Sequence, residues 1–91
     1  MSARIDKSWV VFDSIETGDG TRCIDLFSRL DGTYGFEEFR RDPEDAGLWT
    51  PVNYFSGNAF GNKDEALKAA LKAVAWLTDA LRDRAVMGLR R

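Results

Sequence analysis

The chain has 91 residues, of which 44% are hydrophobic and 31% charged, and its formal net charge is −2. This composition is typical of one globular domain spanning residues 1–91 and excludes a disordered tail. Histidine is absent, which excludes Ser-His-Asp and Cys-His nucleophilic centres and histidine-bearing zinc sites within one chain. We therefore expect no enzyme, no catalytic residue, no cofactor and no metal site.

The single cysteine and the amino-terminal residues both favour a reducing compartment. Cys23 has no second cysteine in the chain to pair with, so a disulfide-stapled secreted fold is excluded. The first residues, MSARIDKS, lack the apolar core of a secretory signal, and no run approaches the roughly 18 apolar residues that span a bilayer. We expect a cytoplasmic protein without a membrane partner.

Three consecutive segments have the composition of β-strands and are separated by glycine-containing turns. The turn Thr17-Gly18-Asp19-Gly20 separates the first two segments, and Asp31-Gly32 separates the second from the third. Short turns between adjacent strands produce antiparallel pairs. The sequence therefore predicts a three-stranded antiparallel meander over residues 8–41, with strands at 9–16, 21–30 and 33–41.

The rest of the chain predicts a loop, a short edge element and a helix. Residues 42–51 are rich in Pro, Asp and Gly and indicate a loop, and residues 52–60 indicate a short fourth strand or an edge segment. Asn62, followed by Glu65, matches a capping box, and the Ala-, Leu- and Lys-rich run after it predicts a helix over 62–84. The expected fold class is α+β, a three- or four-stranded antiparallel β-meander with one long C-terminal helix packed on one face. Residues 1–7 and 85–91 are expected to fray.

Side chains alternate along each strand, so a loop of two residues and a loop of four residues at Asp31-Gly32 place the same side chains on each face. With either loop, both faces of the predicted sheet are apolar. One face matches the leucine stripe of the helix, and the other is aromatic. The helix-facing set is Trp9, Val11, Ile15, Ile24, Leu26, Leu30 and Phe39, and the aromatic set is Val10, Phe12, Cys23, Phe27, Tyr34 and Phe36. A single helix covers only one face, so the aromatic set requires another cover.

Three covers for the aromatic face are open: the chain's own residues 42–60 or carboxy-terminal tail, a second copy of the chain, or a different protein or nucleic acid. We favour a small non-enzymatic binding or assembly module that forms a homodimer or binds a protein partner. The contact would use the aromatic face, an exposed strand edge, or the helix flank at Trp76, a residue that alternatively covers the domain's own flank. The candidate interface residues are Phe27, Tyr34, Phe36, Arg29, Arg40 and Trp76.

The alternative function is a nucleic-acid-binding regulatory protein, in which sheet arginines surround a stacking platform of aromatic side chains. Those arginines are Arg22, Arg29, Arg40 and Arg41. Residues 1–60 hold six basic and eleven acidic side chains, whereas residues 61–91 hold seven basic and four acidic ones. The acidic sheet half would repel phosphates, which disfavours a nucleic-acid partner.

Four stretches resemble a group of small uncharacterised bacterial proteins of unknown function. They are RCIDLF at 22–27, DGTYGFEEFRRDPED at 31–45, WTP at 49–51 and VAWL at 74–77. The resemblance implies a β-meander followed by one long helix and brings no activity with it. The order of elements is also similar to the plant AP2-type and integrase amino-terminal DNA-binding domains, a likeness of fold alone.

Overall fold

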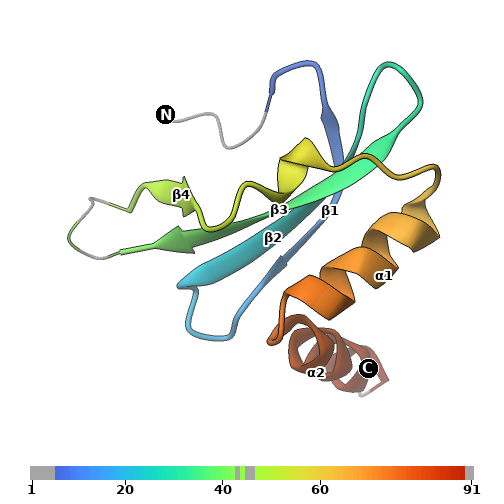
Figure 1. Ribbon diagram of the computed structural model, residues 1–91. Coiled ribbons are helices and arrows are strands. Elements are labelled where there is room, and N and C mark those ends of the chain that lie inside the picture. Colours follow the sequence, from blue (N-terminus) through green and yellow to red (C-terminus); the bar gives the residue numbers. More distant parts are fainter. Residues whose placement is uncertain (1–5, 43, 45–46, 90–91) are drawn as a thin grey trace.

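The computed structural model describes residues 6–42, 44 and 47–89, with side chains described as far as residue 84. The elements in chain order are β1 (Val10–Glu16), β2 (Arg22–Ser28), β3 (Tyr34–Arg41), β4 (Trp49–Pro51), the 3-10 turn η2 (Phe55–Gly57), α1 (Lys63–Ala73) and α2 (Leu77–Leu89). The strands form one antiparallel sheet in the order β1-β2-β3-β4. Both helices lie on one side of this sheet, while the segment that leads into β1 lies on the other (Figure 1). The predicted α+β class is confirmed.

The fourth strand forms earlier in the chain than the sequence predicts. Trp49–Pro51 pairs with the end of β3, within the segment expected to be a loop. Pro51 is the last residue of β4, which is an edge strand, and its missing N–H costs the ladder little there. Residues 52–60 then follow the β3 edge without forming a strand, through a hydrogen bond from Val52 N to Glu38 O and a bridge between Tyr34 and Phe60.

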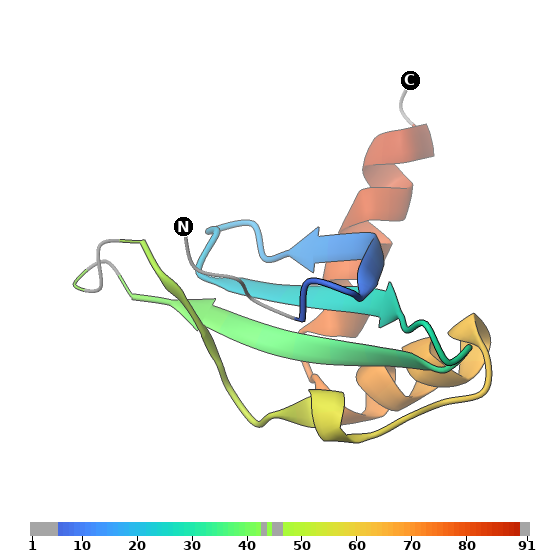
Figure 2. The ribbon, with the colours of Figure 1, turned by 90° about the horizontal axis from the view of Figure 1, so that it is seen from above.

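Two helices replace the single long helix predicted over 62–84. Asn62 caps α1 as expected, since its side chain accepts a 2.8 Å hydrogen bond from Glu65 N. The helix ends at Ala73, because Val74 has an extended backbone with φ −115° and ψ 99°. α2 begins at Leu77 and continues to Leu89, and it extends past β1 (Figure 2). Of the ends expected to fray, residues 1–5 and 90–91 lie outside the described residues, whereas residues 85–89 belong to α2. No described helix is long and apolar enough to cross a membrane.

The length of the second hairpin loop decides which side chains share a sheet face. Arg29 N donates to Thr33 O at 2.8 Å, so the hairpin closes around three residues, 30–32, and Gly32 adopts a φ of 86° that suits a glycine. An odd loop shifts the register by one residue, which pairs Leu26 with Phe36 and moves every β3 side chain to the opposite face. The predicted placement of Tyr34, Phe36 and Phe39 is therefore wrong.

A β-bulge near the start of β1 also changes which side chains share a sheet face. The register shifts between Val11 and Asp13, so that Val11 lies opposite Phe27, whereas Ile15 lies opposite Ile24. The predicted placement of Val11 in the helix-facing set with Leu26 is wrong for this reason, because an extra residue in one strand reverses the alternation beyond it. Ile15 keeps its predicted place with Ile24 and Leu26 on the helix side.

The helix side of the sheet carries the main core. Strand side chains pack there against small and aliphatic side chains of both helices, and such burial contributes about 25 cal/mol per Å² of apolar surface. The members are Ile15, Ile24, Leu26, Phe36, Ala66, Ala70, Val74 and Leu77. On the opposite face Cys23, Phe27 and Phe39 are also fully buried. Both faces of the sheet are thus interior at their centres.

Candidate functional site

The six predicted interface residues do not share one surface. Phe27 is 0% and Phe36 2% exposed, and the two lie on opposite faces of the sheet. Phe36 packs against the rings of Phe55 and Phe60, at centroid distances of 5.0 and 6.0 Å, and Tyr34 also packs against this core. The aromatic sheet face on which the expected interface depended is therefore not a surface of the chain, because the three-residue loop separates its members.

Phe27 is covered by side chains of the chain itself. The ring of Trp9 stacks on it at 4.7 Å, and the guanidinium of Arg29 lies 5.0 Å from the Phe27 centroid and 4.5 Å from that of Trp9. Arg29 also donates to the backbone carbonyls of Ser56 at 2.6 Å and Asn58 at 3.2 Å. Arg29 therefore joins the second hairpin to the edge segment at residues 52–60. Of the predicted covers, residues 52–60 take part through these two carbonyls.

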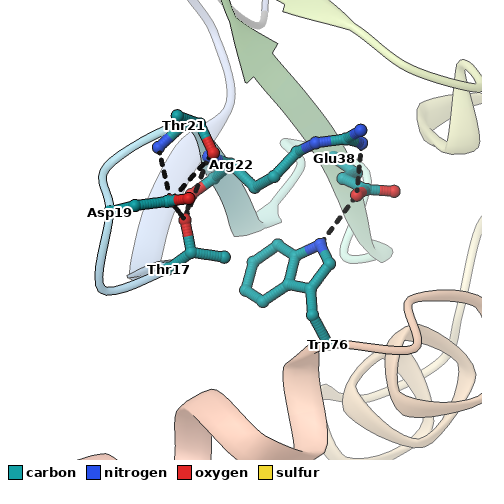
Figure 3. Close-up of polar contacts among 6 residues, drawn as sticks. All are labelled: Thr17, Asp19, Thr21, Arg22, Glu38 and Trp76. Carbon is teal, nitrogen blue, oxygen red and sulfur yellow. Dashed lines mark hydrogen bonds and ion pairs between the residues drawn. The ribbon is translucent and has the colours of Figure 1, made fainter.

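Glu38 is a largely buried carboxylate on the helix side of β3, and it has donors from two other elements. The indole Nε1 of Trp76 donates to Oε2 at 2.8 Å, and Arg22 Nη1 lies 3.4 Å from the same oxygen. Figure 3 shows the indole N–H directed at Glu38 from the linker between the two helices. Trp76 is half-buried, so the reading in which it covers the domain's own flank fits the geometry.

The hairpin turn beside this cluster is organised by Asp19. Its Oδ1 accepts hydrogen bonds from Thr17 Oγ1 at 2.6 Å, from Thr21 Oγ1 at 2.8 Å and from Thr21 N at 3.0 Å (Figure 3). These hydrogen bonds, with that from Thr17 the strongest, lower the pKa of Asp19 to about 2. The carboxylate therefore remains ionised at neutral pH and positions Thr21 at the entry to β2.

A recess of about 220 Å³ lies at this end of the sheet, lined by Thr21, Arg22, Arg40, Arg41 and Asp42. Arg41 is held in place, because it donates to Gly20 O at 2.8 Å and its guanidinium lies 4.5 Å from the Trp49 ring centroid. Arg40 is exposed and lies 3.9 Å from Asp42. Three arginines and one aspartate line the recess, so its formal charge is positive and its chemistry suits an oxyanion. The sequence suggests these three arginines as a group with Arg29, but Arg29 lies at the other end of β2, beside the second hairpin loop.

Exposed apolar side chains gather at the start of the edge strand β1. Val10 is 62%, Val11 38% and Phe12 36% exposed. The ammonium group of Lys63 lies 4.7 Å from the Phe12 ring centroid, a cation–π distance. The sequence places these three residues on the two faces of the predicted sheet and does not predict their exposure at its edge. The bulge beside them has no recognisable signal in the sequence.

Arg84 of α2 contacts the next residues of β1. Arg84 donates to both carboxylate oxygens of Asp13, at 3.2 and 3.1 Å, and to Ser14 O at 3.3 Å. The hydrogen bond with Asp13 raises the pKa of Arg84 above its ordinary value. The exposed apolar part of the edge is therefore confined to Val10–Phe12.

Within the described part of the chain, no three His, Cys, Asp or Glu side chains lie close enough together to hold a metal ion. No protein-family model, curated protein or solved structure matches this chain. Functional assignment therefore depends on the two surfaces described above, the β1 edge and the arginine recess.

Proposed function

We propose that the protein is a small non-enzymatic assembly module that pairs with a second copy of itself through the start of β1. The observation that carries this is the run Val10, Val11 and Phe12, three consecutive exposed apolar residues on a strand at the sheet edge. Exposed edge strands are the parts of sheets that accept a strand from another chain. Two-fold symmetric dimers are the commonest homo-oligomers, and antiparallel addition brings the same three residues of both copies together.

The contact of α2 with β1 favours one position for the partner strand. Charged side chains and bulges are the devices by which proteins block sheet edges. Here the bulge falls at Phe12, between Val11 and Asp13, and the contacts of Arg84 with Asp13 and Ser14 follow directly after it. Pairing is therefore directed to residues 10–12, where apolar side chains would become buried.

The size of the chain also supports an assembly role. A domain of about 90 residues buries only roughly 60 to 65% of the surface that its unfolded chain exposes, so an additional apolar interface adds substantially to its stability. No catalytic role is proposed, since histidine is absent and Cys23 is buried.

Light scattering at increasing protein concentration tests the proposal. We expect the mass of the wild type to rise from that of a monomer to that of a dimer. Val11→Lys should keep the monomer mass at every concentration, because it places like charges opposite each other across the interface. Leu48→Lys is the matched control, because Leu48 is 51% exposed and directly precedes β4, the strand at the opposite edge of the sheet from β1, and this variant should associate like the wild type.

Circular dichroism should show both variants to be folded, since both positions are exposed. A wild type that stays monomeric at the highest concentration measured, or a Val11→Lys variant that dimerises normally, would contradict this interface.

A further inference from the structure

We infer that the arginine recess binds the phosphate group of a small molecule. The recess lies where β2 begins, at Arg22, whereas Val10 pairs with Ser28 at the opposite end of the same strand. The inference is therefore independent of the proposed self-association, and each has its own test.

Arg22 and Arg40 lie directly opposite each other across β2 and β3. Arg41 N donates to Thr21 O at 2.8 Å, so the neighbouring pair, Arg22 and Arg40, is of the non-hydrogen-bonded kind, in which side chains lie closest. Like charges directly opposite each other destabilise a sheet. A bound dianion between the two guanidinium groups would remove this repulsion.

The arginine side chains of the recess have N–H groups available for a ligand. Each guanidinium carries five N–H groups. Among the described residues, Arg22 uses one on Glu38 and Arg41 one on a backbone carbonyl, while Arg40 has only the 3.9 Å ion pair with Asp42. The planar fork of arginine matches two oxygens of a phosphate, and Arg22 and Arg40, which lie opposite each other across β2 and β3, both retain N–H groups for it.

Contacts within the chain hold Arg22 and Arg41 in position before a ligand binds. Glu38 and Trp76 restrain Arg22 from the helix side, and the Trp49 ring and Gly20 O restrain Arg41. Restrained donors lose less conformational entropy on binding than free ones. Arg40, whose side chain is 55% exposed, is left to close on the ligand.

The charges around the recess favour a small molecule over a polymer. Asp42 lines the recess, and Asp19, which binds Thr21, remains ionised beside it. A nucleic-acid strand would bring several phosphates past these carboxylates and across an acidic sheet half, whereas a single phosphate group meets mainly the guanidinium groups.

The test is an NMR titration of the full chain that follows the side-chain Nε–Hε signals of the arginines. The probes are inorganic phosphate, a nucleoside monophosphate and a single-stranded oligonucleotide without terminal phosphates, each compared with sodium chloride at the same ionic strength. We expect saturable shifts of Arg22 and Arg40 with the first two probes. Arg40→Gln should weaken binding by about tenfold or more, the loss expected for a charge-assisted hydrogen-bonded contact.

Arg82→Gln is the matched control, since Arg82 is also exposed and pairs with one nearby carboxylate, Asp79, on α2. It should bind phosphate like the wild type. The inference is overturned if phosphate produces no more shift than chloride, if Arg40→Gln binds as tightly as the wild type, or if only the oligonucleotide binds.

Discussion

The indole Nε1 of Trp76 donates a 2.8 Å hydrogen bond to Oε2 of Glu38 and so ties the linker between α1 and α2 to the internal strand β3. The Glu38 side chain is only 7% exposed, so water does not readily replace a lost donor. We expect Trp76→Phe, which keeps an aromatic ring but removes the N–H, to lower the free energy of unfolding by about 1–3 kcal/mol.

Urea denaturation measures this loss. Tyr54→Phe is the control, because Tyr54 is 72% exposed and its hydroxyl can be removed with little effect. A Trp76→Phe variant as stable as the wild type would show that the hydrogen bond does not hold the linker to the sheet.

Gly35 has no side chain, and this leaves room for the ring of Phe27 on the neighbouring strand β2. A Cβ atom at Gly35 would lie 3.0 Å from Phe27 Cε1 and 3.0 Å from Arg29 Nη2. We expect Gly35→Ala to lower the free energy of unfolding by about 1–3 kcal/mol, the usual cost of overpacking a buried site. Gly18→Ala is the control, because a Cβ atom there meets nothing within 4 Å. Equal denaturation midpoints for the two variants would contradict this packing.

The turn carboxylate Asp19 gives a pH dependence whose sign follows from its pKa. That pKa is about 2 in the folded chain, below the ordinary value of 3.8. The stabilising contribution is therefore complete above pH 3.8 and is lost as the pH falls through the folded value. We expect Thr17→Val to raise the pKa of Asp19, because it removes the strongest of the hydrogen bonds.

Carbon NMR of the carboxyl groups measures this pKa directly. Ser8→Ala is the control: Ser8 lowers the pKa of Asp6 mainly through its backbone N–H and also through its hydroxyl, so removal of the hydroxyl should raise the pKa of Asp6 and leave that of Asp19 unaltered. A pKa of Asp19 that is unchanged in Thr17→Val would contradict the assignment of the main cause.

Arg84 connects α2 to the edge strand, and its removal should affect association more than stability. The Arg84 and Asp13 side chains are 50% and 38% exposed, and such pairs contribute no more than about 1 kcal/mol. If the second copy pairs along β1, Arg84→Ala should strengthen dimerisation, because it releases Ser14 O for the partner strand. Light scattering at one fixed concentration compares it with Arg82→Ala, which should leave the mass unchanged. Weaker dimerisation of Arg84→Ala would instead place Arg84 within the interface.

The local features of this fold were predictable from the sequence because they depend on neighbouring residues. Alternating apolar residues and glycine turns located β1, β2 and β3, and Asn62 with Glu65 located the start of α1. The absence of histidine excluded several kinds of catalytic site without any structure. Each of these inferences needs only the chemistry of a few adjacent side chains.

The sites were decided by tertiary structure. A three-residue loop and a single bulge look almost the same in sequence as their alternatives, yet each moves side chains to the opposite face of the sheet. The break between α1 and α2 has no proline or glycine; it accompanies the burial of both Val74 and Leu77 against the sheet. The break in turn directs Trp76 towards Glu38, 38 residues earlier in the chain. The sequence alone determined which segments become strands and helices, whereas register and packing between distant residues determined which side chains meet.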